Sequence, residues 1–210
     1  TYGEHREYLE FTIKQHKELY LTCKKFKIGY STSVWEKKSA LDMIKSKLKL
    51  DFLKVPSACN LDFELLECLA KGFKKKIHIS LGMTTNSEVK KIFNFFKKYK
   101  REKDLVFYAC TSDYPAKFDD LCLLEILSLK KKYEKKVSSI AFSGHHLGIA
   151  VDVAAFVLGA SYIERHYTLD RSWKGTDHSA SLETSGLTKL CRDINNTFKS
   201  LKYKNGKILK

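Results

Sequence analysis

The stretch that decides the fold is SSIAFSGHHLGIAVDVAAFVLGASYIERHYTLD, residues 138–170. Two short apolar runs within it, residues 138–145 and 161–168, each end on polar side chains and a histidine. Between them lies GIAVDVAAFVLGA, whose pattern is typical of a helix, with Gly159 placed to end that helix before the second run. A strand, a helix and a second strand in this order predict a βαβ unit with parallel strands.

The same alternation extends over the whole chain. Runs rich in β-branched and aromatic residues alternate with longer segments of helical spacing, and these runs are residues 26–33, 51–58, 76–83, 104–112, 138–145 and 161–168. The helical spacing is clearest in residues 87–100, which follow possible capping side chains at Thr85–Glu88. Its apolar face holds Val89, Ile92, Phe93 and Phe96. The alternation predicts an α/β fold with a parallel sheet, either doubly wound or a (β/α)8 TIM barrel. No GxGxxG motif follows a strand, which disfavours the dinucleotide-binding form of the doubly wound sheet.

Composition narrows the function classes. The chain has 210 residues, of which 43% are hydrophobic and 12% aromatic, so we expect one folded domain with a substantial core. A net charge of +15 is compatible with a nucleic-acid partner, but arginine, the favoured residue for bidentate phosphate and base contacts, occurs only at 6, 101, 165, 171 and 192. We therefore expect no nucleic-acid partner, and an attraction for small anions instead.

Membrane and redox signals point to a cytoplasmic protein. The sequence contains no run of about 18 uninterrupted apolar residues, and residues 1–11 show no apolar signal region, so we expect no membrane partner. Cysteines occur at 23, 59, 68, 110, 122 and 191 without a CxxC pair. This spacing favours buried, reduced thiols over a zinc cluster or a disulfide framework.

Polar residues gather at the C-terminal end of each apolar run. Because strand side chains alternate between faces, those sharing a face are Tyr30 with Thr32, His78 with Ser80 and Gly82, Tyr108 with Cys110 and Ser112, Ser143 with His145, and Glu164 with His166. In a barrel these side chains would converge inside the rim that carries the active site. The pattern therefore favours one shared site at the strand ends.

Two of the histidines are candidates for metal ligands. Neutral imidazole binds divalent transition metals, and His145 with His166, on adjacent strand ends, would leave coordination positions open for a substrate. The alternative is that both merely cap their strands by hydrogen bonding. His146 points the other way along its strand, so we expect a supporting or structural role, and we expect His78 to be structural.

Several of these segments together resemble the sialic acid synthase family, which includes the N-acetylneuraminate, legionaminate and pseudaminate synthases. Residues 142–183 resemble the family segment with the motifs Tyr-Ser-Asp-His-Thr-Leu-Gly, Ile-Glu-Lys-His-Phe-Thr-Leu-Asp, Gly-Pro-Asp-His and Ala-Ser-Leu-Glu. ISLGMTT and YACTSDYPA are similar to its Ser-Thr-Gly-Met and His-Cys-Thr-Ser-x-Tyr-Pro motifs, and YSTSVWE and LKVPSA to its third and fourth strand ends. The resemblance covers about residues 5–190 in the family's order.

The resemblance implies a (β/α)8 TIM barrel of which strands three to eight are present. Residues 1–195 would form this partial barrel domain and residues 196–210 a C-terminal tail or linker, with no counterpart of the first two strands or of the antifreeze-like domain. It also implies a metal-dependent condensation of phosphoenolpyruvate with an N-acyl hexosamine resembling N-acetylmannosamine, which gives a sialic acid-type nonulosonate and phosphate. The implied cofactor is Mn²⁺ or Mg²⁺, and a homodimer is an open alternative to a monomer.

The resemblance also assigns roles to residues. It implies His145 and His166 as metal ligands, Lys54 and Glu164 as catalytic residues, and Asp177 and Tyr114 as sugar-binding residues. The implied phosphoenolpyruvate contacts are Thr32, Lys54, Ser57, Ser80, Ser112 and Ser143. Plainer interpretations exist: a solvated lysine for Lys54, a turn for Asp177, packing on Pro115 for Tyr114, and for Glu164 a carboxylate that holds a ligand histidine or pairs with an interior cation.

Three residues depart from the family motifs. Cys59 replaces an acidic residue after the fourth strand, Gly144 replaces the aspartate before the first metal histidine, and Ala109 replaces a histidine. These departures suggest an altered sugar pocket. They also keep open a second hypothesis, a sugar- or phosphoenolpyruvate-binding barrel without chemistry, beside the disfavoured nucleic-acid binder.

Overall fold

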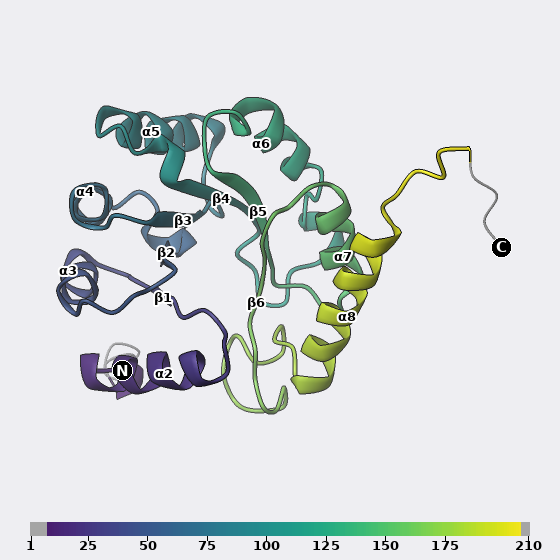
Figure 1. The fold of residues 1–210 in the computed structure, drawn as a ribbon, viewed down its shortest axis with the longest axis horizontal. Helices are drawn as coiled ribbons and strands as arrows, with labels where there is room; N and C mark the ends of the chain where they lie inside the picture. The colour runs from purple at the N-terminus through teal and green to yellow at the C-terminus, as the bar shows by residue number, and fades with distance from the viewer. Residues whose placement is uncertain (1–7, 207–210) are drawn as a thin grey trace. The chain divides into compact units, whose positions relative to one another are not determined.

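Six strands alternate with helices along the chain in a computed structural model that describes residues 8–206 (Figure 1). Backbone contacts divide the described chain into two units. The first takes in the residues up to Ser80 together with Thr84–Val106, and the second takes in Leu81–Met83 and the residues from Phe107 onward. Strand order follows chain order within each unit, and the pairings described below are parallel. The predicted α/β class is therefore confirmed.

Among the described residues, the first unit contains three strands, four α-helices and two short 3-10 helices. Its elements in chain order are α2 (Ile13–Lys25), β1 (Thr32–Ser33), α3 (Lys37–Lys45), β2 (Phe52–Val55), the 3-10 helix η1 (Ser57–Cys59), α4 (Phe63–Gly72), β3 (Lys76–Ser80), α5 (Asn86–Lys98) and η2 (Glu102–Asp104). β1 pairs with β2 and β2 with β3, and the register sets Lys54 beside His78. The helices of this unit lie along one side of its strands (Figure 1).

Alternating side chains form the core of the first unit. Leu53, Val55, Ile77 and Ile79 are fully buried on β2 and β3, as are Leu65, Leu66 and Leu69 on α4. α5 begins with a capping box, in which the Thr85 side chain accepts from the Glu88 N–H and the Glu88 carboxylate accepts from the Thr85 N–H. The predicted apolar face of α5 is buried, which confirms the sequence interpretation of this helix.

The second unit contains the stretch from which the sequence analysis began. β4 (Leu105–Cys110) enters it from the first unit, and then follow η3 (Phe118–Asp120), α6 (Glu125–Tyr133), β5 (Ser139–Gly144), α7 (Ala150–Val157), β6 (Ile163–Arg165) and α8 (Thr184–Ser200). β5 and β6 are parallel, with Ser143 beside Glu164 and Gly144 beside Arg165. α7 packs against both strands and contacts α8. The βαβ unit predicted for residues 138–170 is therefore confirmed.

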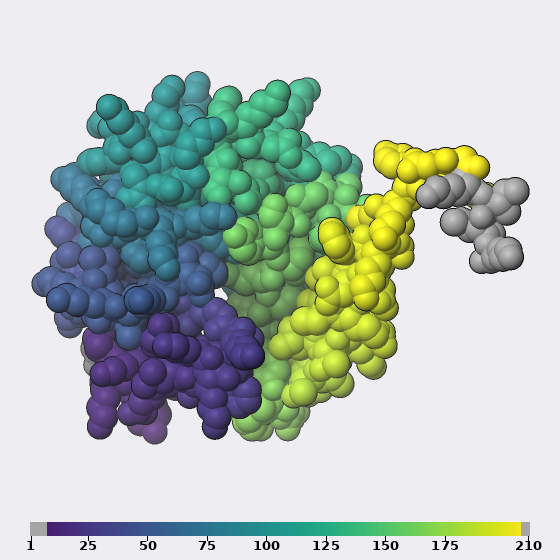
Figure 2. Space-filling model, in the orientation of Figure 1, coloured from purple at the N-terminus to yellow at the C-terminus, as the bar shows by residue number. Residues whose placement is uncertain are grey.

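The ends of the second unit's helices differ from expectation in one respect. Gly159 follows α7 with φ +98°, a left-handed conformation suited to glycine, as predicted for a helix end. α8 was not predicted, and it continues across residue 195, where the sequence analysis ended the barrel segment. In Figure 2 α8 lies on the surface of this unit, and residues 201–206 lead away from it.

The cysteine side chains are more exposed than the sequence predicts. All six thiols are free, but four are half-buried and Cys122 and Cys191 are exposed, so the prediction of buried cysteines was wrong. Cys122 lies in the connection before α6, and Cys191 lies on an outer face of α8. Within residues 8–206 no helix combines the length and the apolar character that a membrane span requires.

Candidate functional site

Two imidazole rings lie side by side at the C-terminal ends of β5 and β6. The ring centroids of His145 and His166 are 5.3 Å apart, with an angle of 51° between the ring planes. Each histidine directly follows its strand, and parallel strands that pair in register bring such residues to the same edge. The predicted juxtaposition of the two rings is confirmed, whereas their role as metal ligands stays a prediction.

The orientation of His145 is fixed by the loop after β4. Its Nδ1 lies 2.7 Å from the carbonyl oxygen of Thr111, and since a carbonyl can only accept, Nδ1 carries a proton, which in the neutral ring puts the lone pair on Nε2. The carbonyl oxygen of His145 in turn accepts from the N–H of Ala116 at 3.0 Å. His145 is only 3% exposed. The same loop therefore holds both the ring and the backbone of this residue.

Asp177 approaches His166 from the long loop after β6. The Asp177 Oδ2 atom lies 3.7 Å from Nδ1 of His166, and both side chains are partly exposed, at 43% and 38%. The hydroxyl of Thr176 donates to Asp177 Oδ1 at 2.8 Å, and the N–H of Leu182 donates to the carbonyl oxygen of His166 at 2.8 Å. The Asp177 carboxylate therefore lies beside His166, and its role in sugar binding stays a prediction.

The two imidazole rings are the part of this edge on which a metal prediction depends. Within residues 8–206 no group of three or more His, Cys, Asp or Glu side chains is arranged to hold a metal ion. The arrangement is therefore no closed structural cage, which would use four protein ligands. The paired rings, with His145 in the tautomer that presents Nε2, are compatible with a two-histidine catalytic site.

Glu164 and Ser143 form a pair beside the histidines. They are register partners on β6 and β5, and the Ser143 hydroxyl donates to Glu164 Oε1 at 2.8 Å. Burial first, and then the Glu164 carboxylate, raise the pKa of Tyr108 well above its ordinary value. Because its proton is directed at Glu164, Ser143 would meet a phosphoenolpyruvate oxygen as a donor only after this hydrogen bond breaks.

Tyr114 covers both histidine rings. Its ring centroid lies 4.3 Å from that of His145 and 5.6 Å from that of His166, in a T-shaped arrangement with the latter. Burial, and then Cys110 and the nearby carboxylates of Asp177 and Glu164, raise the pKa of Tyr114 to about 12. The phenol therefore stays protonated at neutral pH and can donate a hydrogen bond. Of the other residues in this loop, Ser112 has its hydroxyl 4.0 Å from the sulfur of Cys110.

The predicted phosphoenolpyruvate residues of the first unit lie at its strand ends. Lys54 is only 6% exposed, so it is not a solvated lysine, and Ser80 is 3% exposed. Ser57 opens the 3-10 helix after β2, and the Thr32 hydroxyl donates weakly to the carbonyl oxygen of Ser33 at 3.4 Å. The structural role expected for His78 is supported by its ring, which stacks on Phe52 at 3.6 Å. Their contacts with a substrate remain predictions.

One polar residue of the first unit escaped the sequence analysis. Asn60 is 2% exposed, and its side-chain amide donates to the carbonyl oxygen of Ser80 at 2.9 Å. It thereby fixes the end of β3 from the loop after β2. Asparagine in a loop is so common that no signal in the sequence distinguished it.

A model of the NeuB family matches residues 1–206. The chain belongs to the NeuB family. It is 37% identical to an N-acetylneuraminate-9-phosphate synthase of Drosophila melanogaster over 196 residues, which are 93% of this chain and 51% of that protein. It is 35% identical to an N,N'-diacetyllegionaminic acid synthase of Campylobacter jejuni over 194 residues, which are 92% of this chain and 56% of that protein. The chain therefore spans about half the length of the curated relatives it matches.

Solved structures of NeuB relatives and of other synthases resemble the chain. The N-acetylneuraminic acid synthetase from Leptospira borgpetersenii, determined with citrate, has a TM-score of 0.83 at 30% identity, over 96% of this chain and 67% of that one. A truncated 3-deoxy-D-arabino-heptulosonate 7-phosphate synthase from Thermotoga maritima has a TM-score of 0.75 at 15% identity, which shows similarity of fold alone. The family predicted from the motifs is thus confirmed, and the eight-stranded barrel remains a proposal.

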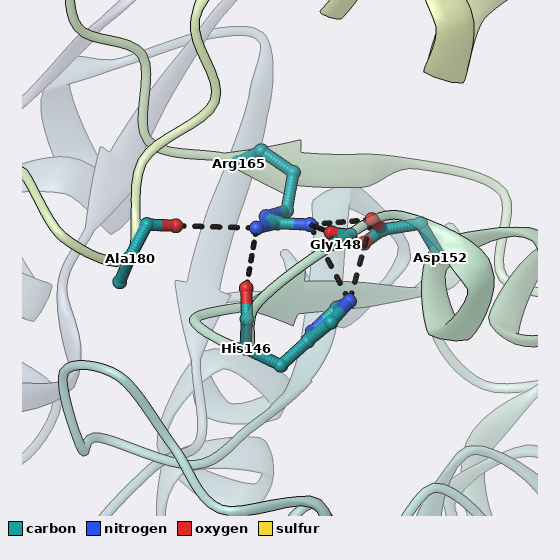
Figure 3. Close-up of polar contacts among 5 residues, drawn as sticks. All are labelled: His146, Gly148, Asp152, Arg165 and Ala180. Carbon is teal, nitrogen blue, oxygen red and sulfur yellow. Dashed lines mark hydrogen bonds and ion pairs between the residues drawn. The ribbon is translucent and has the colours of Figure 1, made fainter. Parts of the chain in front are cut away.

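This NeuB chain carries a further polar cluster that the sequence analysis missed. Asp152, His146 and Arg165 have fully or almost fully buried side chains that contact one another behind the strand ends (Figure 3). The supporting role expected for His146 agrees with this placement. The available signal was the aspartate within the otherwise apolar run GIAVDVAAF, because a charge in a buried helix face requires a partner.

Proposed function

We propose that this NeuB chain is the catalytic part of a synthase that condenses phosphoenolpyruvate with an N-acyl hexosamine. C3 of phosphoenolpyruvate would form a bond to the aldehyde carbon of the sugar, water would add at C2, and the C–O bond to the phosphate would break, which yields a nonulosonate and inorganic phosphate. The observation that carries the proposal is the His145–His166 pair at adjacent strand ends, in a family whose curated members are named as sialic, legionaminic and pseudaminic acid synthases.

The metal ion of this proposal is Mn²⁺ or Mg²⁺, held by His145 and His166. When bound, it would act as a Lewis acid that polarises the sugar aldehyde. The Thr111 carbonyl supports this assignment because it orients His145 with Nε2 as the atom that accepts. Asp177 Oδ2 lies 3.7 Å from Nδ1 of His166. Its carboxylate would accept a hydrogen bond from this ring and so orient it, or it would bind a sugar hydroxyl as the resemblance implies.

The chain's own side chains would bind and orient the two substrates. Tyr114 stays protonated and would donate to the sugar, and Asp177 would accept from its hydroxyls. Glu164, whose carboxylate accepts a hydrogen bond from Ser143, would take up a proton released near the reacting carbons, such as that of the water that adds at C2. Lys54, buried on β2, would supply the positive charge for the carboxylate or phosphate of phosphoenolpyruvate. The hydroxyls of Thr32, Ser57, Ser80 and Ser112 complete the proposed contacts with that substrate.

The architecture and setting of the protein are part of the same proposal. The six strands would be strands three to eight of a (β/α)8 barrel, with residues 1–195 as the partial barrel domain and 196–210 as a tail or linker. The six free thiols support a reducing compartment, and hence the cytoplasm. The partners would be small molecules, with a homodimer as an open alternative to a monomer.

The test is phosphate release by the full-length protein with phosphoenolpyruvate, Mn²⁺ and a panel of free and 6-phosphorylated N-acyl hexosamines. We expect release with at least one sugar, and its loss in His145→Ala and His166→Ala together with loss of Mn²⁺ binding. His16→Ala, whose histidine is in α2 of the first unit, is the matched control and should leave both unchanged. Tight binding of phosphoenolpyruvate without turnover on any sugar would favour the non-catalytic barrel, for which the replacement at Cys59 argues.

A further inference from the structure

Arg165 is the last residue of β6 and stands between two site residues, but its side chain points away from them. Glu164 and His166 flank it in the chain, and alternation along the strand directs its side chain to the opposite face. There the guanidinium is 2% exposed, and Nη1 donates to Asp152 Oδ2 of α7 at 2.6 Å. Figure 3 shows the guanidinium at the centre of a cluster whose other members are His146, Gly148, Asp152 and Ala180.

The remaining donors of Arg165 hold backbone from two loops. Nη1 donates to the carbonyl oxygen of Gly148 at 2.7 Å, and Nη2 donates to the carbonyl oxygens of His146 at 2.6 Å and Ala180 at 3.1 Å. Residues 146 and 148 belong to the loop that begins with His145, and residue 180 to the loop that begins with His166. One planar guanidinium therefore connects the two segments that carry the histidine pair, which a single ammonium group could not match.

Gly144 makes room for this cluster. It is the register partner of Arg165, and a Cβ atom at this position would lie 2.9 Å from Asp152 Oδ1 and 2.9 Å from Cε1 of His146. The carboxylate of Asp152 thus occupies its position only because residue 144 has no side chain. Gly144, Asp152 and Arg165 therefore pack as one set, in which a side chain at 144 would crowd the Asp152 carboxylate.

The hydrogen bonding of this buried cluster is incomplete within the protein, which is unexpected if the cluster serves only to stabilise the fold. Among residues 8–206, Arg165 Nε, Asp152 Oδ1 and His146 Nδ1 are buried and accept or donate no hydrogen bond to another atom of the protein. Buried polar atoms without partners reduce stability, and hydrophobic replacement of a buried ion pair is often neutral or stabilising. The geometry therefore argues for a role in placing the loops.

We propose that Arg165 is a positioning residue, which, together with Asp152 and the space left by Gly144, holds the backbone of the loops after β5 and β6 so that His145 and His166 stay adjacent. This role rests on the proposed function for its link to metal binding and turnover. The placement of the two loops itself can be measured without a metal or a substrate.

The test uses Arg165→Lys in the full-length protein, with Arg101→Lys as the matched control. Arg101 also donates to two carbonyl oxygens, those of Ala70 and Lys75, and pairs with Asp104, but it does so in the first unit. We expect Mn²⁺ affinity, followed by electron paramagnetic resonance with the metal alone, to fall about 10- to 100-fold in Arg165→Lys and to be unchanged in Arg101→Lys. The value of kcat should fall in parallel, whereas KM for phosphoenolpyruvate should not change.

Hydrogen exchange without metal supplies the independent measurement. The amides of Ala116 and Leu182 donate to the carbonyl oxygens of His145 and His166, so both should exchange faster in Arg165→Lys, while the Gly159 amide at the end of α7 should not. Unchanged exchange at Ala116 and Leu182 would overturn the proposal. If Arg165→Lys does not fold, Asp152→Asn is measured in the same way, with the same expectation and the same overturning result. A wild-type protein without Mn²⁺ binding or phosphate release would instead refute the proposed function, while the exchange rates would still decide the role of Arg165.

Discussion

Removal of the Asp152 carboxylate should be one of the most damaging single substitutions on α7. The Arg165 side chain is only 2% exposed. Asp152→Leu removes the carboxylate to which it donates and leaves only backbone carbonyl oxygens as its acceptors. Breaking a buried pair by removal of one partner costs about 3–5 kcal/mol of unfolding free energy. For a chain of this size, that corresponds to a fall in Tm of roughly 6–20 °C.

Urea unfolding followed by far-UV circular dichroism measures this loss, and the chain contains a matched control. Arg192 and Asp193 form an ion pair on α8 whose side chains are 61% and 34% exposed, so Asp193→Leu should leave the urea midpoint almost unchanged. The double variant Arg165→Met/Asp152→Leu should recover part of the loss, because no charge then stays buried, but not all of it, because the carbonyls of His146, Gly148 and Ala180 lose their donor. Equal losses for Asp152→Leu and Asp193→Leu would refute the reasoning.

Three further outcomes are expected. Gly144→Ala should lower the unfolding free energy by about 1–3 kcal/mol through overpacking. Gly186→Ala is the control, because its Cβ would contact only Leu182, at 3.3 Å or beyond, and should not lower the unfolding free energy. Equal urea midpoints for the two variants would contradict this prediction. Because the pKa of Tyr114 is raised from 10.0 to about 12, the folded state keeps a proton that the unfolded state loses, so stability should fall between these pH values, and more steeply than in Tyr114→Phe. Lys54→Met should abolish calorimetric binding of phosphoenolpyruvate, and Lys76→Met, an exposed lysine on β3, should leave it intact.

The alternation of strands and helices was predictable because it follows from local patterns. The capping box at Thr85 and Glu88, the buried face of α5 and the helix end at Gly159 all depend on residues within one turn of each other. Strand extents were less predictable, because pairing with a neighbour decides them. The run 26–33 contributes only Thr32–Ser33 to β1, and the run 161–168 only Ile163–Arg165 to β6.

The candidate site was predictable where side chains of one motif meet, and not where distant backbone takes part. His145 and His166 end equivalent strands, so their proximity followed from parallel pairing. The contacts of Arg165 with the carbonyl oxygens of His146, Gly148 and Ala180 carry no residue signature, because every residue has a carbonyl group. The prediction that the cysteines are buried was wrong for a related reason. Apolar neighbours in the sequence do not determine which side of a loop or helix faces the solvent.

The acceptor that orients His145 belongs to the main chain at Thr111. Substitution of residue 111 changes its side chain but keeps the carbonyl oxygen. The hydrogen bond that orients the His145 ring therefore does not depend on which residue occupies position 111. Substitutions in this strand-end motif can therefore leave the orientation of the His145 ring unchanged, and only a shift of the main chain itself would alter it.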